Sequence, residues 1–275
     1  MAFFCEAQEL YHKDNHYHNA IHATDVAQGM FYFMERGGAN QLWQFNLLET
    51  VSWIISAAIH DLDHPGFNNF YLVKTKSPLA VMYNDKSVLE NYHVAWAFNI
   101  LRDERFDIFS NLTQESKATA RSIIIETILG TDNAVHFDHL NKFKDRKVAE
   151  DFDPTGKDKV DLMAMMMHSC DLSNPGRPLE YSKKWSLRIL DEFFLQGDKE
   201  RELGLPITNL CDRYSINVAK SQIGFFDFFV KPFFSEVTDV FTTMNFIVGN
   251  IESNVEYWKT QVNRCQKELE ELQDA

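Results

Sequence analysis

The sequence predicts an all-α fold, in which a single domain covers residues 1–275. Apolar residues recur at helical spacing over several long stretches, whereas sustained alternation of apolar and polar residues is rare. The chain has only 11 glycines and 7 prolines, fewer than a turn-rich all-β fold would need. Neither an internal repeat nor a shift in composition marks a second domain. A unit of this length can bury roughly three-quarters of its unfolded-chain surface, so we expect one large core.

Three stretches before residue 200 show the pattern of a helix with one buried face. The first covers 47–59, and its apolar face holds Leu47, Val51, Ile54, Ile55, Ala58 and Ile59. The β-branched run 123–125 could be a strand, but the residues that follow it favour a buried helix. A third helix is expected to stop at Gly197, and its apolar face holds Trp185, Ile189, Leu190, Phe193 and Phe194. We expect a cluster of methionines to fill the core: Met163 and Met165–Met167.

The C-terminal segment is the most regular part of the sequence. Its apolar residues follow a heptad seam, formed by Val237, Phe241, Met244, Val248, Ile251, Val255, Trp258, Val262, Cys265, Leu269 and Leu272. This seam could join two copies of the chain as a coiled-coil homodimer. We favour a long helix that packs on its own domain, because Gly249 lies inside the seam. Loops are expected over 141–159 and 198–212, and His136 and His139 are expected at the surface.

The charge of the chain excludes several classes of partner. Lysine and arginine number 27 and aspartate and glutamate 40, so the net charge is −13. Such a chain repels phosphate, which argues against a nucleic acid polymer or an anionic membrane as partner. The four cysteines are scattered and suggest no disulfide framework. The first residues lack the features of a signal peptide, and no apolar run approaches the roughly 18 residues of a membrane span. We therefore expect a soluble, cytoplasmic protein.

Histidines are concentrated near the N-terminus, in the run HKDNHYHNAIH. His18 and His22 lie one helical turn apart there, about 6 Å along the axis of a helix. Such a pair can hold a metal ion. However, His12 and His16 have the same spacing, and a histidine-rich stretch also produces it by chance.

A stronger cluster follows the helix over 47–59. The run HDLDH places four ionisable residues at the end of this apolar helix, namely His60, Asp61, Asp63 and His64. Each unpaired buried charge would cost several kcal/mol, whereas a divalent cation would neutralise the carboxylates and accept imidazole nitrogen. The alternative is a polar helix end in solvent, with His64 interacting favourably with the helix dipole.

Asp171 follows another strongly apolar run, in the stretch MAMMMHSCDLSNP. By itself it could be an ordinary exposed acid. Together with the two other clusters it would complete a site of two histidines and two aspartates, which leaves positions for water as catalytic metal sites do. A second ion, bridged by a carboxylate and water, would give the two-metal arrangement that cleaves phosphoesters.

Six ordered motifs resemble the catalytic domain of class I cyclic nucleotide phosphodiesterases: YHNAIHATDV, HDLDHPGFNN, LENYH, GTD, CDLSNP and SQIGFFDFFV. The resemblance spans residues 17–230 and implies a compact multi-helix bundle of the HD-domain type with a deep, metal-containing pocket. In the family, several helices usually precede the first motif, whereas only 16 residues precede Tyr17 here. We therefore expect an N-terminally short domain with apolar surface left uncovered.

The resemblance also implies roles for individual residues. Four match the ligands of the more tightly held metal, usually zinc: His22, His60, Asp61 and Asp171. Asp61 would also reach a second ion, usually magnesium or manganese, and the residues that match those around its waters are His64, Glu90 and Thr131. Asn69 has a supporting role. His18 matches the general acid, although its spacing from His22 alone would make it a ligand.

Gln222 and Phe225 match the residues that hold the purine, an amide at the base edge and a ring on the base face. Because the amide both donates and accepts, it can serve adenine or guanine. Asn174 favours cAMP over dual use, since family members that prefer cAMP resemble the chain there; in Ser-Asn-Pro it could equally form a turn. Ile189 and Phe193 could line the base pocket or belong to the core.

The implied reaction is hydrolysis of the 3′ phosphoester bond of a 3′,5′-cyclic nucleotide to a 5′-nucleoside monophosphate. A metal-bound hydroxide would be the nucleophile, because a bound ion can lower the pKa of water from about 15.7 to about 7. Protonated His18 would supply the proton that the leaving oxygen needs. The alternatives are another HD-type nucleotide phosphohydrolase and an inactive helical scaffold that retains the motifs.

Overall fold

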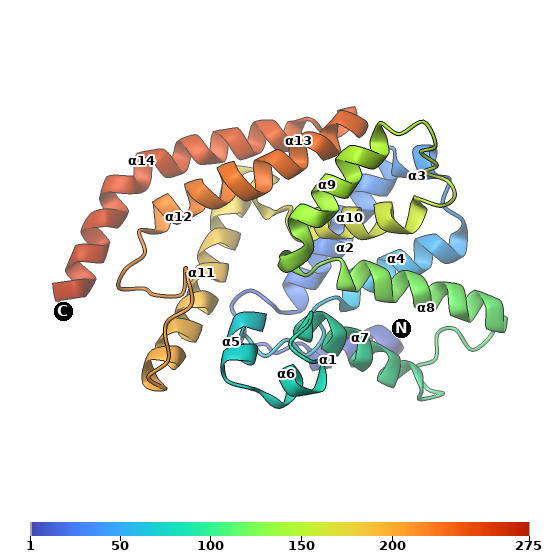
Figure 1. Cartoon of the computed structure of the whole chain (residues 1–275), viewed down its shortest axis with the longest axis horizontal. Coiled ribbons are helices and arrows are strands. Elements are labelled where there is room, and N and C mark those ends of the chain that lie inside the picture. The colour runs from blue at the N-terminus through green and yellow to red at the C-terminus, as the bar shows by residue number, and fades with distance from the viewer. Residues whose placement is uncertain (1, 275) are drawn as a thin grey trace. The chain divides into compact units, whose positions relative to one another are not determined.

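The computed structural model describes residues 2–274, and in this range the chain forms helices and no β-strand (Figure 1). The prediction of an all-α fold is confirmed. The described residues form two compact units. Unit 1 comprises the described residues up to Pro65 together with Lys76–Asp171, and unit 2 comprises Gly66–Thr75 together with the described residues from Leu172 onward. A single domain over 1–275 stays a prediction. Within the range described, no helix combines the length and the apolar character that crossing a membrane requires.

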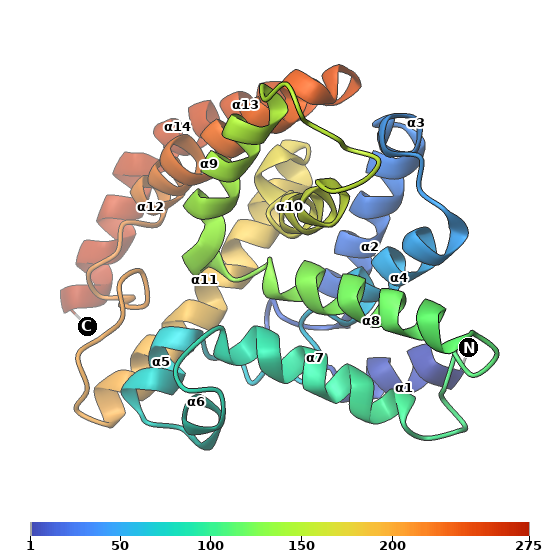
Figure 2. The same cartoon turned by 45° about the vertical axis from the view of Figure 1, so that its right-hand side comes forward.

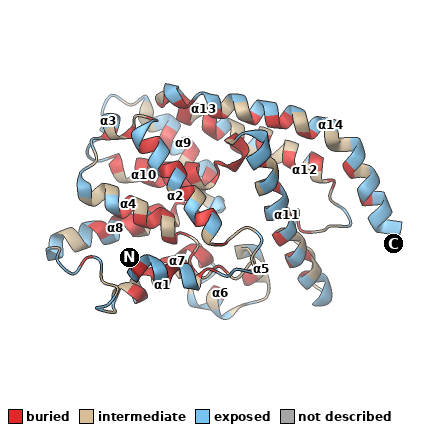
Figure 3. Ribbon diagram, turned by 180° about the vertical axis from the view of Figure 1, so that it is seen from behind, coloured by how far each residue is buried: buried red, intermediate tan, exposed pale blue. Residues whose placement is uncertain are grey.

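The helices of unit 1 build a layered bundle. They are α1 (Ala2–Leu10), α2 (Ala20–Glu35), α3 (Ala39–Trp43), α4 (Leu47–Ile59), α6 (Pro78–Met82), α7 (Val88–Leu101), α8 (Gln114–Leu129), α9 (His136–Lys147) and α10 (Lys159–Asp171), with a 3₁₀ turn at Asn133–Val135. Helices α2, α4, α8 and α10 pack against one another (Figure 2). Helix α10 is buried along almost its whole length (Figure 3), and its methionines fill the core as predicted.

Helix α4 confirms the prediction of a helix over 47–59, but its buried face differs from the predicted stripe. Asn46 and Glu49 form a capping box at the start of the helix, each side chain accepting a hydrogen bond from the backbone N–H of the other residue. Leu47 and Val51 are exposed, whereas Ser52 and Ser56 are fully buried. The small serines let α8 approach closely, and Thr127 of α8 donates a hydrogen bond to the Ser56 hydroxyl over 2.9 Å. Which residues of α4 are buried therefore depends on close packing against α8, and not on residue hydrophobicity alone.

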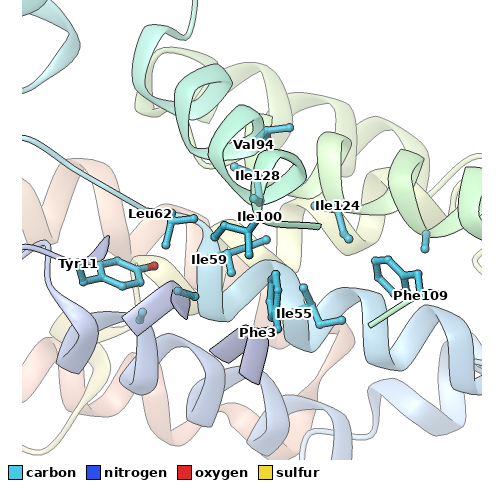
Figure 4. Close-up of a cluster of buried hydrophobic side chains, with 14 residues drawn as sticks. Phe3, Tyr11, Ile55, Ile59, Leu62, Val94, Ile100, Phe109, Ile124 and Ile128 are labelled. Carbon is cyan, nitrogen blue, oxygen red and sulfur yellow. The ribbon is translucent and has the colours of Figure 1, made fainter. Parts of the chain in front are cut away.

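A hydrophobic cluster joins α1, α4, α7 and α8 (Figure 4). Phe3 from α1 lies beside Ile55 and Ile59 from α4, with Val94, Ile100, Ile124 and Ile128 from α7 and α8 around them. Tyr11 completes the cluster and donates its hydroxyl proton to the carbonyl of Ala58 over 3.1 Å. Ala58 lies one residue before the end of α4. This packing therefore fixes the end of the helix, which His60 and Asp61 directly follow.

Unit 2 is built mainly from the C-terminal helices. Its elements are α5 (Asn69–Lys74), a 3₁₀ turn (Asn174–Gly176), α11 (Leu179–Glu202), α12 (Val218–Phe225), a π-helical turn (Phe226–Val230), α13 (Lys231–Val240), a second 3₁₀ turn (Thr242–Met244) and α14 (Phe246–Asp274). The predicted seam is therefore broken between Phe241 and Phe246. Helix α14 packs against α11, α12 and α13 in its own unit, as we favoured. Dimerisation through this helix stays a prediction.

A buried polar network fixes α5 in unit 2. Gln196 of α11 accepts a hydrogen bond from the backbone of Asn68 over 2.9 Å, which holds the start of α5. Lys74 at its other end donates to the fully buried carboxylate of Glu200 over 3.0 Å and to the carbonyl of Pro206 over 2.6 Å. A buried carboxylate is stable only with such partners, so these contacts bind α5 and the chain after α11 to one face of α11.

The prediction that a helix stops at Gly197 is wrong, because α11 continues to Glu202. This also makes the first residues of the predicted loop 198–212 helical. The glycine is explained by packing: a Cβ atom built at Gly197 would lie 1.8 Å from the carbonyl oxygen of Cys211. The residue is thus required for close approach of the returning chain and not for helix termination.

Gly197→Ala is expected to destabilise the protein by about 1–3 kcal/mol, because a backbone carbonyl and not a flexible side chain would have to move. Gly249→Ala is the matched control. Gly249 is also inside a helix, but no atom lies within 4 Å of its added Cβ, so alanine should stabilise by about 0.5–1 kcal/mol. Thermal unfolding of both variants checks this, and equal midpoints would contradict the packing explanation.

Two predictions about the stretch before α10 are also wrong. The predicted loop 141–159 begins inside α9, which continues to Lys147; its basic last turn suits the negative end of the helix dipole. His136 is fully buried and not at the surface, whereas His139 is half-buried. Nδ1 of His136 lies 2.9 Å from Nε2 of His168 on α10. Burial lowers the pKa of His168 to about 3, so the His168 ring is neutral where it meets His136 between the two helices.

Candidate metal centre and active site

Three helices of unit 1 bring four predicted ligands together. His22 lies in the first turn of α2, which begins where the Asn19 side chain accepts hydrogen bonds from two backbone N–H groups. His60 and Asp61 follow the last residue of α4, and Asp171 is the last residue of α10. Both histidines are fully buried, and one donor atom from each of the four side chains lies within 4.8 Å of all the others.

The distances between these donor atoms fit a metal ion. Nε2 of His22 lies 2.9 Å from Asp171 and 3.5 Å from Asp61, and Nε2 of His60 lies 3.4 Å and 3.1 Å from the same carboxylates. The two nitrogens are 3.3 Å apart. Bonds of about 2.1 Å to a common ion place two ligand atoms about 3.0 Å apart at a right angle and about 3.4 Å apart at a tetrahedral angle. All five distances lie close to this range, so the donor set fits a divalent metal.

The hydrogen bonds and charges of the cluster also suit a metal. Nδ1 of His60 donates to the carbonyl of Ala57 over 2.9 Å, which leaves Nε2 to face the carboxylates. Burial would raise the pKa of Asp61 and Asp171, but the neighbouring imidazoles hold both well below the ordinary value. Burial would likewise lower the pKa of His60, but Asp61 and Asp171 raise it well above the ordinary value. The carboxylates are therefore ionised, which is the form that binds metal, whereas His60 would give up its Nε2 proton on binding the same ion.

Beside the four donors lies a column of three histidine rings. The His18 and His64 rings stack with centroids 3.9 Å apart and planes 16° apart, and His93 stacks on His64 at 5.7 Å. His18 also meets His22 edge to face, at 5.9 Å between centroids. His93 is not among the predicted site residues, although the spacing Glu90-x-x-His93 places both residues on one face of a helix. Nδ1 of His93 donates to the carbonyl of Leu62 over 2.6 Å, and Nε2 lies 3.8 Å from Asp61.

The two other predicted residues of unit 1 lie on neighbouring elements. Glu90 is buried in the first turn of α7. Thr131 is buried just after α8, where its hydroxyl donates to the carbonyl of Ile128 over 2.8 Å. The close four-residue donor set includes neither of them.

The predicted base-binding residues belong to unit 2. Gln222 is buried and Phe225 half-buried on α12, three positions apart and so on one face. The Phe225 ring stacks on Phe229 of the π-helical turn, at 5.4 Å between centroids. Asn174 is buried at the start of its 3₁₀ turn, and Ile189 and Phe193 are half-buried on α11. Asn69 is the half-buried first residue of α5.

The turn that carries Asn174 is held by α14. The Asn254 side chain on α14 donates to the carbonyls of Pro175 and Arg177 over 2.8 and 2.9 Å. Asn250, one turn earlier, donates to the carbonyl of Gly176 over 2.8 Å. The C-terminal helix therefore fixes the backbone around a predicted base-binding residue.

Comparison with known proteins agrees with this geometry. Residues 17–251 match the family described as 3′5′-cyclic nucleotide phosphodiesterase. The chain is 38% identical over 262 residues to the probable 3′,5′-cyclic-AMP phosphodiesterase pde-4 of Caenorhabditis elegans, a match that covers 92% of this chain and 39% of that protein. The chain thus spans about two-fifths of the length of this curated relative.

Solved structures give the same result. The phosphodiesterase domain of Salpingoeca rosetta rhodopsin phosphodiesterase has a TM-score of 0.89 and 31% identity, covering 98% of this chain and 82% of that one. LmjPDEB1, solved in complex with IBMX, has a TM-score of 0.88 and 31% identity, covering 95% and 78%. With the family match over most of its length and the closely spaced His/Asp donor set of its first unit, the chain belongs to the 3′5′-cyclic nucleotide phosphodiesterase family.

Proposed function

We propose that the chain hydrolyses the 3′ phosphoester bond of 3′,5′-cyclic nucleotides, with cAMP preferred, and releases 5′-nucleoside monophosphates. The observation that carries the proposal is the set of donor atoms on His22, His60, Asp61 and Asp171, which lie within 4.8 Å of one another. Membership of the family supplies the reaction class. The name of the Caenorhabditis elegans relative, a probable 3′,5′-cyclic-AMP phosphodiesterase, supports cAMP as substrate.

In this proposal the four donors would hold zinc, and Asp61 would also be a ligand of a second ion, magnesium or manganese. His64, Glu90 and Thr131 would surround the water shell of the second ion, and Asn69 would have a supporting role. When bound, the two ions supply positive charge that attracts the phosphate to an acidic protein and acidify a water molecule at neutral pH. Two imidazole nitrogens and two carboxylate oxygens suit zinc, because that ion accepts both kinds of ligand.

His18 is the proposed general acid. As the oxygen of the attacking water bonds to phosphorus and the P–O3′ bond breaks, the electron pair of that bond goes to O3′, and a proton from the His18 imidazole neutralises that oxygen. The ring lies edge to face with His22, beside the four donors, and the charge of Asp61 interacts with it. His18 is therefore near the proposed metal and remains outside the four-residue donor set.

The proposed base-binding residues are Gln222 and Phe225, with Asn174, Ile189 and Phe193 around them. Gln222 would bond the edge of the purine and Phe225 would stack on its face, a contact worth about 1–3 kcal/mol. The Phe225–Phe229 stack supports this assignment, because it fixes the orientation of the Phe225 ring.

The test is a comparison of kcat/KM for cAMP, cGMP and p-nitrophenyl phosphate with Mg²⁺, before and after chelation. We expect cAMP to be the best substrate, 5′-AMP to be the product, and chelation to abolish turnover until metal is restored. Hydrolysis of p-nitrophenyl phosphate alone would indicate another phosphohydrolase. Stoichiometric zinc without turnover of any of the three substrates would indicate a scaffold, and 3′-AMP as product would contradict the proposed bond.

A further inference from the structure

We propose that Asn15 is a positioning residue, whose side-chain amide fixes the backbone on which the general acid His18 is carried; this inference rests on the proposed function. Nδ2 of Asn15 donates to the carbonyl of His18 over 3.0 Å and to the carbonyl of His64 over 2.7 Å. One amide thus joins the segment before α2 to the turn after α4.

The chemistry of the amide is essential to this contact. A side-chain NH₂ group has two N–H donors, and here each meets one carbonyl oxygen. A carboxylate of the same shape has only acceptors, so it would repel both carbonyls. The two carbonyls belong to the two residues whose rings stack at 3.9 Å, so the amide fixes the two backbones that carry the stack.

Asn15 is itself held from the other side. Its backbone carbonyl accepts a hydrogen bond from the side chain of Asn19 over 2.8 Å. Asn19 is the residue whose oxygen caps α2, the helix that carries His22. The contacts therefore run from the first turn of α2, through Asn15, to the turn that follows Asp61.

A second contact holds the same turn. Asp63 has a φ of 59°, a left-handed conformation that is unfavourable for most residues with a Cβ atom. Nε2 of His12 donates to its carboxylate over 2.6 Å, and the hydroxyl of Tyr92 donates to it from α7. The segment 12–15 therefore holds two successive residues of the HDLDH motif. His12 binds the side chain of Asp63, and Asn15 binds the backbone carbonyl of His64.

Asn15→Asp is the sharpest test, because it changes two donors into acceptors with almost no change in volume. We expect kcat for cAMP to fall about 10- to 100-fold, since a displacement of about 1 Å in a catalytic group can cost about 10²-fold. KM and zinc content should stay close to the wild-type values. Asn15→Ala removes the donors without adding charge and should give a smaller loss of the same kind.

Asn91→Asp is the matched control. The side chain of Asn91 also donates to two backbone carbonyls, those of Lys86 and Ser87, over 3.1 and 3.0 Å. Asn91→Asp also replaces the amide NH₂ group by a carboxylate oxygen, but neither of the two carbonyls belongs to a residue of the histidine stack. We expect kcat of this variant to stay within about twofold of wild type.

Two readouts separate positioning of His18 from a general loss of structure. The first is a cAMP analogue with sulfur in place of the bridging O3′, since a thiolate (pKa about 8.5) leaves without protonation; the Asn15 variants should regain most of the lost rate on it. The second is the NMR signal of the His18 ring protons in the metal-loaded and chelated protein. Stacking on His64 shifts these signals upfield, and Asn15→Asp should reduce that shift.

Unchanged kcat and unchanged ring shifts in both Asn15 variants would overturn the inference, as would an equal loss on the oxygen and sulfur substrates. Either result leaves the proposed function intact if the wild-type protein hydrolyses cAMP. If the wild-type protein does not hydrolyse cAMP, the proposed function fails. The ring shifts still report whether Asn15 holds His18 against His64.

Discussion

Asp171→Asn is expected to remove bound zinc and to lower cAMP turnover by at least about 10³-fold, the largest single effect that we anticipate. Asp171 supplies the oxygen that lies 2.9 Å from His22 and 3.4 Å from His60. An amide oxygen keeps the shape but not the negative charge, and a cluster with one carboxylate holds a dication much less strongly. The measurements are zinc content of the purified variant and kcat/KM with added Mg²⁺.

A third readout for this variant does not depend on turnover. Zinc at 100 times its dissociation constant should stabilise the wild-type protein by about 2.7 kcal/mol, and the variant should show almost none of this shift. Asp161→Asn is the control, because Asp161 lies on the same helix but forms only an exposed ion pair with Lys142. Full zinc content and full activity in Asp171→Asn would refute the metal centre.

His18→Gln should lower kcat by about 10²–10⁴-fold, the usual contribution of a general acid. Zinc content should not change, since the donor set consists of four other residues. His16→Gln makes the same substitution at an exposed position two residues earlier and should leave kcat nearly unchanged. If His18→Gln loses zinc together with activity, His18 is a ligand, as its spacing from His22 alone would have suggested.

The parts of the fold that follow from local pattern could be predicted. Apolar periodicity found α4 and α11, and the residues after 123–125 correctly favoured helix α8. Apolar periodicity and helix-stop signals failed where tertiary contacts determine the role of a residue. Gly197 has the sequence appearance of a helix stop, but its role depends on the carbonyl of Cys211, which the chain brings near only after returning along α11.

The candidate site divides in a similar way. His60, Asp61 and Asp171 could be singled out because ionisable groups at the ends of apolar helices need a compensating partner, whereas the choice of His22 over His18 as the fourth donor rests on the resemblance to the phosphodiesterase family. The distances between them depend on how α2, α4 and α10 pack, and no pattern in the sequence encodes that. Asn15 could not be found from sequence, because its significance is a pair of hydrogen bonds to backbone atoms, and backbone atoms are the same for every residue type.

The membership of α5 in unit 2 has a consequence for the order in which the protein can be made. A ribosome releases Lys74 long before Glu200 and Pro206, which are its partners in the folded state. These contacts cannot form during the interval, because Glu200 lies 126 positions and Pro206 lies 132 positions after Lys74 in the chain. The second unit is therefore built from two segments of the chain that are separated by part of the first unit, and a gene fragment starting at Leu172 would encode a protein without Lys74.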